Sequence, residues 1–353
     1  MYCSHFLTER FENLKMISVL FIINPISGTE SKQQILHDIE VHFDRQKFSW
    51  QVAYTAYAGH GAVLATMAAE NGYDMVVAIG GDGTVNEIAR SLVHTQTILG
   101  IIPCGSGNGL ARHLRIPLDS SRAVEILNQF NVRELDYGII NKRPFFCTCG
   151  MGFDATVSYK FASSIKRGML SYLENTLKEI TRYKPETYII EDESGQQQLK
   201  AFLLTCANAS QYGNNAYIAP EASMSDGLMD VTVIRPFTVM EAPQLAYQLF
   251  NGTLSNKGHI TMFRSKKLHI IREHEGVIHC DGDPFKAGKE IDVTIESKQL
   301  RAITGDDMEI KPDTLLQTIT EAFSLFVSKG QNTLETGIRQ AGKGLLSKLQ
   351  PKH

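Results

Sequence analysis

The stretch Met75-Val-Val-Ala-Ile79, followed at once by Gly80-Gly-Asp-Gly-Thr-Val-Asn-Glu87, indicates the fold of the amino-terminal part of the chain. Continuous apolar residues from Met75 to Ile79 are typical of a parallel strand that is buried on both faces. Residues 86–93 have helical spacing, so the stretch predicts a strand, a tight turn and a helix. Three glycines in four positions let the turn approach a ligand closely, and the helix start offers unpaired N–H groups to a phosphate. Taken alone, the stretch also fits a tight turn that binds no ligand.

The same alternation of strand and helix continues on both sides of this stretch. Apolar runs predict further strands at 17–23, 50–54 and 97–102, and helical spacing predicts helices at 31–43 and 61–71. Strands that alternate with helices indicate a parallel sheet covered by helices. We therefore predict a Rossmann-like α/β domain over residues 16–135.

The pattern changes after about residue 135, where a helical stretch at 155–183 precedes a series of short strands. These strands are predicted at 187–191, 199–207, 229–234, 268–272, 277–281 and 291–295. Short strands at such spacing favour an antiparallel sheet or sandwich. We predict a second, β-sandwich-like domain over 136–299, and a chain of 353 residues is long enough for about two domains.

Two more glycine-rich loops follow predicted parallel strands. Asn24-Pro-Ile-Ser-Gly28 follows the first strand, and Pro103-Cys-Gly-Ser-Gly-Asn-Gly109 follows the fourth. The carboxyl ends of parallel strands share one edge of the sheet, and Thr55 at the end of the second strand would face the same edge. Backbone N–H groups from three converging loops, together with hydroxyl groups, predict a cradle for a triphosphate. The hydroxyl groups are those of Ser27, Thr84 and Ser106.

These loops and three later motifs resemble the diacylglycerol kinase catalytic domain superfamily, which includes bacterial lipid kinases and the sphingosine and ceramide kinases. The later motifs are Gly150-x-Gly-Phe-Asp-Ala155, Ala219-Pro-Glu-Ala-x-x-x-Asp226-Gly-Leu-x-Asp230 and Asp281-Gly-Asp283-Pro284. The resemblance spans roughly residues 17–310. It implies a kinase of two domains with a cleft between them, in which helices at about 300–328 return to the first domain.

The resemblance also implies roles for individual residues. It makes Asp281 the general base, with Asp283 and Asp82 as further catalytic carboxylates. ATP would bind at residues of the three loops and of the second strand end. These residues are Asn24, Ser27, Gly28, Thr55, Gly80, Gly81, Asp82, Gly83, Thr84, Val85, Asn86, Glu87, Gly105, Ser106 and Asn108.

Magnesium is the second cofactor that the resemblance implies. A structural Mg²⁺ would be held by the Asp226 carboxylate and the carbonyl groups of Ser223 and Leu228. Asp82 would contact Mg²⁺ either through a water molecule or at the Mg²⁺ that is bound to ATP. A carboxylate suits both roles, because hard cations take oxygen ligands.

Two positions depart from the pattern of the relatives. Asp283 stands where many relatives have glutamate, so the charge is kept on an arm one methylene shorter. Gly109 stands where bacterial diacylglycerol kinases often have aspartate, and Gly-Ser-Gly-Asn108 is closer to the sphingoid kinase version. The sequence therefore leaves open whether the lipid is diacylglycerol or a sphingoid or ceramide-type lipid.

The charge is nearly balanced in sum but uneven along the chain. There are 35 basic and 38 acidic side chains, and a balance so near zero argues against a nucleic-acid binder. Residues 329–353 carry five basic side chains against Glu335, with Leu334, Ile338, Ala341, Leu345 and Leu349 at helical steps. This basic amphipathic tail fits either a helix on an anionic membrane surface or a helix that packs on the protein.

Location and start site are predicted from the ends and the cysteines. No apolar run approaches the roughly 20 residues that cross a bilayer, and the six scattered cysteines favour a reducing compartment. We expect a cytoplasmic protein that meets the inner face of a membrane. The sequence is compatible with translation from Met1 or from Met16. It is also compatible with a homodimer.

We therefore expect an ATP- and Mg²⁺-dependent kinase that transfers the γ-phosphoryl group to a hydroxyl of a membrane lipid. One alternative is a kinase of a soluble acceptor such as NAD, because NAD kinase shares a Gly-Gly-Asp-Gly loop. The Asn86-Glu87 pair and the late Asp281-Gly-Asp283 argue against it. Another alternative is a lipid-binding regulator without activity, which would be expected to have lost Asp82 or Asp281.

Overall fold

The computed structural model describes residues 16–28, 31–162, 180 and 182–305 of the chain. These residues form two compact units. The first contains the chain up to Gly105, Ile116–Glu134 and Leu300–Gly305, and the second contains Ser106–Arg115 and Leu135–Gln299. The predicted helix beyond residue 162, the returning helices beyond residue 305 and the basic tail at 329–353 lie outside the described residues.

The first unit is built on a parallel sheet of the predicted kind, with the order β2-β1-β3-β4. Its strands are β1 (Ile17–Ile23), β2 (Phe48–Tyr54), β3 (Met75–Gly80) and β4 (Ile98–Pro103). Every residue of β3 and β4 is buried, which explains why both read as unbroken apolar runs. Strand β2 lies at the edge, and after the buried Phe48 its residues are exposed or half-buried.

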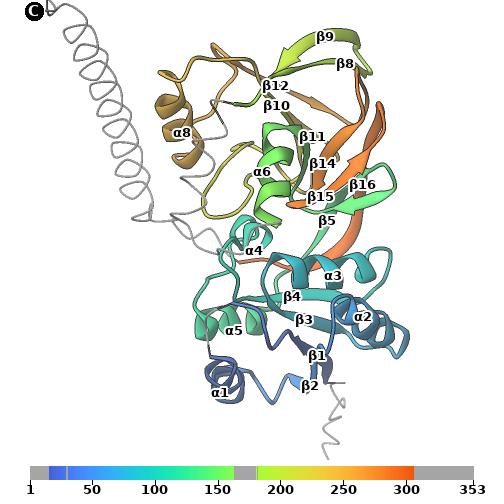
Figure 1. The fold of residues 1–353 in the computed structure, drawn as a ribbon. Helices are drawn as coiled ribbons and strands as arrows, with labels where there is room; N and C mark the ends of the chain where they lie inside the picture. The colour runs from blue at the N-terminus through green and yellow to red at the C-terminus, as the bar shows by residue number, and fades with distance from the viewer. Residues whose placement is uncertain (1–15, 29–30, 163–179, 181, 306–353) are drawn as a thin grey trace, which may run out of the picture. The chain divides into compact units, whose positions relative to one another are not determined.

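Helices cover both faces of this sheet (Figure 1). Helix α1 packs against α5 on one face, and α2 packs against α3 on the other. Their bounds are α1 (Lys32–His42), α2 (His60–Glu70), α3 (Asp82–Leu92) and α5 (Ser120–Gln129). In α3 the buried residues Val85, Ile88, Ala89 and Leu92 recur at steps of three and four, so one apolar stripe attaches the helix to the sheet.

Helix α3 begins earlier than its spacing indicated. The sequence placed its start at residue 86, whereas the structure starts it at Asp82, with Gly81 as the N-cap. Asp82, Gly83 and Thr84 are therefore the first helical turn and not part of the turn before it. An aspartate in that turn is stabilised by the helix dipole, and a glycine there has no intrahelical N–H bond to lose.

The second unit contains two antiparallel sheets. One has the order β12-β11-β10-β7-β14-β15, and the other contains β9, β8, β13 and the first part of β16, with the β5–β6 hairpin beside it. The strands are β5 (Val132–Ile140), β6 (Arg143–Phe145), β7 (Thr148–Gly152), β8 (Glu186–Asp192), β9 (Gly195–Ala201), β10 (Leu203–Ala207), β11 (Met229–Ile234), β12 (Ile260–Ser265), β13 (Lys267–Arg272), β14 (Gly276–Cys280), β15 (Asp283–Ala287) and β16 (Glu290–Ile303).

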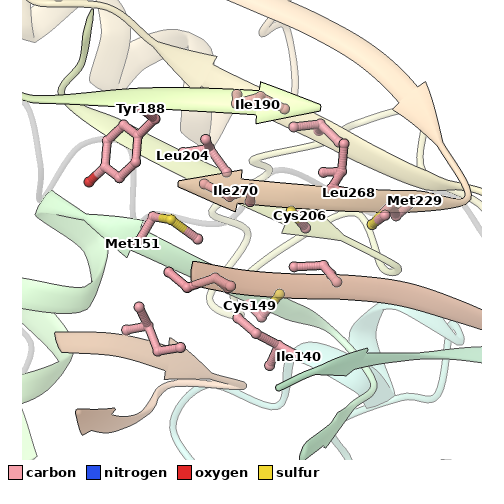
Figure 2. Close-up of a cluster of buried hydrophobic side chains, with 14 of the residues drawn as sticks. Ile140, Cys149, Met151, Tyr188, Ile190, Leu204, Cys206, Met229, Leu268 and Ile270 are labelled. Atoms are coloured by element: carbon pink, nitrogen blue, oxygen red, sulfur yellow. The ribbon is translucent and has the colours of Figure 1, made fainter. Parts of the chain in front are cut away.

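A common apolar core lies between the inner faces of these sheets (Figure 2). Met151, Leu204 and Cys206 from the first sheet pack with Tyr188 and Ile270 from the second, and all are fully buried. This is the sandwich arrangement that the spacing of the strands predicted. The described residues of this unit also form three helices: α4 (Gly109–His113), α6 (Phe153–Ala162) and α8 (Ala242–Phe250).

The predicted strand at 199–207 is wrong as a single element. It is two strands, because the chain leaves β9 at Ala201 and enters β10 at Leu203, and the two strands belong to different sheets. The four residues from Ala201 to Leu204 are all apolar, so hydrophobicity gives no sign of the change. The sequence also did not indicate β5, β6, β12 and β15.

Strand β16 has residues in both units. Its first part pairs with β13 in the second unit, and its last residues return to the first, where Ala302 pairs with Leu99 of β4 in parallel. Within the described ranges, no helix is long and apolar enough to cross a membrane.

Candidate functional site

The first and third glycine loops meet at Gly28. Its φ of +68° favours glycine, and a Cβ at this position would overlap the carbonyl oxygen of Cys104. The Ser27 hydroxyl donates to the carbonyl oxygen of Asn24 at 2.9 Å, which closes the first loop into a turn. The backbone of the first loop therefore lies directly against the backbone that follows β4.

The second loop contacts both of the others. The side-chain amide of Asn24 donates to the Thr84 hydroxyl oxygen at 2.9 Å, which joins the first loop to the start of α3. A Cβ on Gly80 would lie 2.5 Å from the Thr84 Cβ, and one on Gly81 would lie 3.2 Å from the Cα of Gly105. The three loops predicted to share one sheet edge are thus in contact within the first unit.

Gly83 differs from these packed glycines. A Cβ at Gly83 would meet no atom within 4 Å, and its φ does not lie in the left-handed region. The residue is exposed in the first turn of α3, where the helix presents its unpaired N–H groups. Neither packing nor backbone conformation requires glycine here, so the open space is the part of the loop that suits the close approach of a phosphate.

The other predicted nucleotide-binding residues of the first unit surround these loops. The Thr55 N–H donates to the Ile23 carbonyl oxygen at 2.9 Å, so Thr55 lies beside the end of β1. The Glu87 carboxylate accepts a hydrogen bond from the Gly59 N–H at 3.0 Å. Val85 and Asn86 are buried in α3, which gives them a structural role in holding the helix.

The second half of the third loop belongs to the second unit. Asn108 is buried with a φ of +52° and is the N-cap of α4, while Ser106 is exposed. Arg112 in this helix donates from Nε to the Gly107 carbonyl oxygen at 3.1 Å. The loop is therefore closed by the first turns of the helix that follows it.

Asp281 is held by three consecutive backbone N–H groups. The Phe146 N–H donates to its Oδ2 at 2.8 Å, and the N–H groups of Cys147 and Thr148 donate to its Oδ1 at 2.8 and 2.9 Å. Asp281 has a φ of +49° and is half-buried. Three N–H donors stabilise the negative charge and fix the direction of the carboxylate. Asp283 begins β15 and is exposed.

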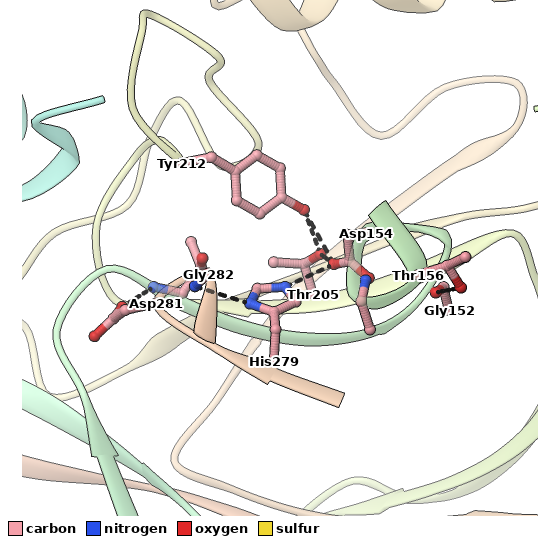
Figure 3. A network of polar contacts seen from close by, with 10 residues as sticks. Gly152, Asp154, Thr156, Thr205, Tyr212, His279, Asp281 and Gly282 are labelled. Carbon is pink, nitrogen blue, oxygen red and sulfur yellow. Dashed lines mark hydrogen bonds and ion pairs between the residues drawn. The ribbon is translucent and has the colours of Figure 1, made fainter. Parts of the chain in front are cut away.

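A buried polar network lies beside Asp281 (Figure 3). Asp154 Oδ2 accepts hydrogen bonds from the Thr205 hydroxyl at 2.7 Å and the Tyr212 hydroxyl at 3.2 Å, and it contacts His279 Nε2 at 3.1 Å. The other ring nitrogen of His279 accepts from the N–H of Gly282, next to Asp281, at 3.4 Å. The network thus connects α6 and β10 to the turn that carries the candidate base.

Three thiols lie side by side beneath the same turn. Cys149 is opposite Cys206 on one neighbouring strand and opposite Cys280 on the other, and all three are buried. Burial, with the nearby Cys206, raises the pKa of Cys149 well above its ordinary value. A protonated, buried thiol is a poor nucleophile, so Cys149 fits a place in the core.

The predicted structural metal site is a turn between Ser223 and Leu228. Asp226 is exposed, and its Oδ1 accepts the Leu228 N–H at 3.1 Å. The turn is held by the buried Asp136, whose Oδ2 accepts the Gly227 N–H at 2.7 Å and whose own N–H donates to the Met224 carbonyl oxygen at 2.6 Å.

This turn fits magnesium by the chemistry of its donors. A carboxylate and two carbonyl groups are all oxygen ligands, as Mg²⁺ prefers. No group of three or more His, Cys, Asp or Glu side chains that could hold a metal is found in the part of the chain that the structure describes. The ligand set expected at this turn has one carboxylate, from Asp226, and two backbone carbonyl groups, from Ser223 and Leu228.

Sequence reasoning missed Asp136, Asp154, Asn208 and His279 as residues that position the site. Asp154 belongs to the Gly-x-Gly-Phe-Asp motif, which by itself gives the residue no role. Gly150 of that motif is the one residue in the sequence that points to this pair. A Cβ on Gly150 would lie on the Asp154 carboxylate and 2.9 Å from His279 Nε2. Glycine at this position is required by the buried pair.

Two family domains cover most of the chain. Residues 18–140 match the diacylglycerol kinase catalytic domain. Residues 147–313 match the YegS C-terminal NAD kinase beta sandwich-like domain. These matches agree with the two kinds of architecture, a parallel sheet with helices and an antiparallel sandwich.

Similar proteins include curated bacterial kinases and solved structures. The chain is 27% identical to a diacylglycerol kinase of Bacillus subtilis over 74% of this chain and 88% of that protein. It is 31% identical to a probable lipid kinase YegS-like protein of Chromohalobacter salexigens over 66% of this chain and 77% of that protein. A crystal structure of a putative diacylglycerol kinase from Bacillus anthracis shares the fold, with a TM-score of 0.68 at 21% identity over 82% of this chain and 98% of that one. The chain belongs to the diacylglycerol kinase family of lipid kinases.

Proposed function

We propose that this protein transfers the γ-phosphoryl group of ATP to a hydroxyl group of a membrane lipid, either diacylglycerol or a sphingoid or ceramide-type lipid. The observation that carries the proposal is the contact of three glycine loops around the start of α3, with open space at Gly83. The Asp281 turn supports it, because it supplies an oriented carboxylate.

The nucleotide would be bound mainly by backbone groups. The N–H groups at the start of α3 and along the loops at Gly28 and Gly105 would donate to phosphate oxygens, and the Ser27 and Thr84 hydroxyls lie in the same loops. Phosphoryl transfer depends on positioning and charge neutralisation more than on covalent help. Loops that are packed against one another before the nucleotide arrives supply that positioning.

Asp281 would act on the acceptor hydroxyl. An alcohol is too weak an acid to lose its proton to a carboxylate in advance. The carboxylate orients the hydroxyl and accepts its proton while the oxygen bonds to phosphorus and the bond from the γ-phosphorus to the leaving oxygen of ADP breaks. The three N–H donors hold the carboxylate in one direction, and Asp283 would contribute a second negative charge beside it.

Magnesium would supply charge neutralisation at the phosphates. Asp82 would reach the metal of the nucleotide through water. Asp226, with the carbonyl groups of Ser223 and Leu228, would hold a separate structural ion. Both assignments are proposals from the oxygen chemistry of these residues.

The acceptor places the reaction at a membrane surface. Diacylglycerol and ceramide have long acyl chains and stay in the bilayer, so the protein must meet them there. We propose a cytoplasmic enzyme that works at the inner face of the membrane, acting as a monomer or as a homodimer, with no part for nucleic acid.

The test is an acceptor panel with matched variants. The purified protein is incubated with labelled ATP, Mg²⁺ and mixed micelles of diacylglycerol, sphingosine or ceramide, and separately with NAD. Asp281→Asn should lose activity, while Asp292→Asn, an exposed carboxylate paired with His269, should keep it. Label on NAD would contradict the lipid assignment, and lipid phosphorylation that survives Asp281→Asn would contradict the role of that residue.

A further inference from the structure

We propose that the segment of residues 208–216, here called the connecting segment, is a positioning element that links Asp281 to the third glycine loop. It follows β10 and contacts both sites within the second unit. The inference rests on the proposed function, because it gives the segment a role in aligning the acceptor with the nucleotide. It is carried by hydrogen bonds that, together with short stretches of backbone between them, join the Asp281 carboxylate to the Gly107 carbonyl group.

The first link is the side chain of Asn208. Its Nδ2 donates to the carbonyl oxygens of Phe146 and Asp136, each at 2.9 Å, and the residue is fully buried. Both partners are carbonyl groups, which only accept, so the amide nitrogen must face them. The Phe146 carbonyl belongs to the same peptide unit as the Cys147 N–H, which donates to Asp281 Oδ1 at 2.8 Å. One peptide plane is therefore held by Asn208 at its oxygen and by Asp281 at its nitrogen.

The next peptide unit is held in the same way. The Cys147 carbonyl oxygen accepts the N–H groups of Asn208 at 2.9 Å and Ala209 at 3.0 Å. The N–H of this peptide is that of Thr148, which donates to Asp281 Oδ1 at 2.9 Å. Two consecutive peptide planes thus separate the start of the connecting segment from the carboxylate. Hydrogen bonds on both sides of a peptide polarise it and strengthen one another.

The second link joins the connecting segment to α4. His113 Nδ1 lies 3.1 Å from the Ser210 nitrogen, which donates to it, and 3.0 Å from the Ser210 hydroxyl oxygen. Burial, with the charge of Arg115, lowers the pKa of His113 to about 4. The ring is neutral near pH 7, so Nδ1 can accept the N–H.

The third link reaches the glycine loop itself. Arg112 donates from Nη1 to Asn215 Oδ1 at 2.9 Å and from Nε to the Gly107 carbonyl oxygen at 3.1 Å. The Asn214 N–H donates to the same carbonyl oxygen at 3.0 Å, and a Cβ on Gly213 would lie 3.0 Å from it. The end of the connecting segment lies so close to Gly107 that only glycine fits at 213.

This arrangement gives the connecting segment a consequence for rate. Its first residues fix the peptides that orient Asp281, and its last residues fix the third loop, with few residues between. Reaction rates fall steeply when reacting groups are misplaced by even 1 Å. A substitution at one end of the connecting segment should therefore shift the groups that the other end positions.

The test begins with Asn208→Leu, which keeps the size of the side chain and removes both donated hydrogen bonds. We expect kcat to fall by about 10- to 100-fold, with little change in the KM for ATP. Arg112→Gln acts at the other end, so it should raise the KM for ATP. The matched control is Thr232→Val in β11. It removes one buried hydrogen bond, which the Thr232 hydroxyl donates to the Ile218 carbonyl oxygen at 2.9 Å. It should lower thermal stability and leave kcat unchanged.

Two measurements separate positioning from general destabilisation. If Asn208 acts through Asp281, Asn208→Leu should cost little further activity in an Asp281→Asn background. Hydrogen exchange at the amides of Cys147 and Thr148 should become faster in Asn208→Leu and stay the same in Thr232→Val. This second measurement needs no substrate, so it remains valid if no lipid is phosphorylated.

The outcomes are distinguishable from failure of the proposed function. A wild-type protein that phosphorylates no lipid refutes the lipid kinase assignment, while the exchange data still test the link. Equal loss of kcat in Asn208→Leu and Thr232→Val, additive loss with Asp281→Asn, or unchanged exchange at residues 147 and 148 would overturn the inference. If Asn208→Leu does not fold, Arg112→Gln decides, because it should speed exchange along the connecting segment and not only in α4.

Discussion

Replacing Gly83 by alanine should make the protein more stable and a weaker binder of ATP. The structure leaves room for the added methyl group, since no atom lies within 4 Å of it, and the backbone φ is one that alanine adopts. Gly83 lies in the first turn of α3, where alanine loses less conformational freedom on folding than glycine does.

The size of each effect follows from this geometry. Glycine within a helix costs about 0.5–1 kcal/mol relative to alanine, so the melting temperature should rise by about 1–4 °C. The methyl group would occupy the space beside the N–H groups of the helix start, where we place a phosphate. We expect the Kd for ATP to rise at least about tenfold, which corresponds to about 1.4 kcal/mol.

Both quantities can be measured on the same samples, by thermal unfolding without nucleotide and by calorimetric titration with Mg-ATP. Gly288→Ala is the control, because a Cβ there also meets nothing within 4 Å at an ordinary φ, and the residue lies in the turn before β16. It should leave ATP binding unchanged. An unchanged Kd for ATP in Gly83→Ala would refute the placement of the phosphates at the start of α3.

Three further predictions follow from the same structure. Asp281→Asn should lower kcat by about 100-fold or more. It should also lower the free energy of unfolding by about 1–3 kcal/mol, because an amide nitrogen would face N–H donors. Initial rates measure the first effect and urea unfolding the second, and wild-type stability would contradict the hydrogen-bonded geometry. Gly28→Ala should destabilise the first unit, because its Cβ would overlap the Cys104 carbonyl oxygen; an unchanged melting temperature would show that the two loops do not touch. The pKa of His113 is about 6.5 in the unfolded chain and about 4 in the folded protein. The contribution of the neutral ring to the free energy of unfolding should therefore be fully present above pH 6.5. The free energy of unfolding should fall by up to about 3 kcal/mol as the pH is lowered towards 4. Urea unfolding across this pH range should show a flatter profile for His113→Gln, and an equally steep profile would contradict the burial of the ring.

The parallel sheet and the meeting of its loops could be predicted from sequence, because both depend on local patterns. Buried parallel strands are uninterrupted apolar runs, as in 17–23 and 75–79, and the ends of such strands share one edge. Contact between Gly28 and Cys104 and between Gly81 and Gly105 is a consequence of that topology. The assignment of these residues to ATP stays a prediction.

Features that depend on distant partners could not be predicted. The start of α3 at Asp82 was missed because three glycines in four positions argue against a helix, although only Gly83 lies in the first helical turn, where a glycine is tolerated. The chain changes from one sheet to the other at Phe202, but the residues beside it are apolar on both sides, so hydrophobicity does not indicate the change. The N–H groups around Asp281 come from residues more than 130 positions away, and no periodicity indicates which backbone groups will face a carboxylate.

Strand β16 has a consequence for the order in which the chain folds during synthesis. Its final residues, which pair with β4, follow β4 by nearly 200 positions in the chain. At about 5–20 residues per second, the edge of β4 emerges from the ribosome roughly 10–40 s before its partner exists. Open strand edges attract other chains, so for that interval the nascent protein must keep this edge from pairing wrongly. Among the described residues, the unit that begins the chain also contains the last ones to be translated, Leu300–Gly305.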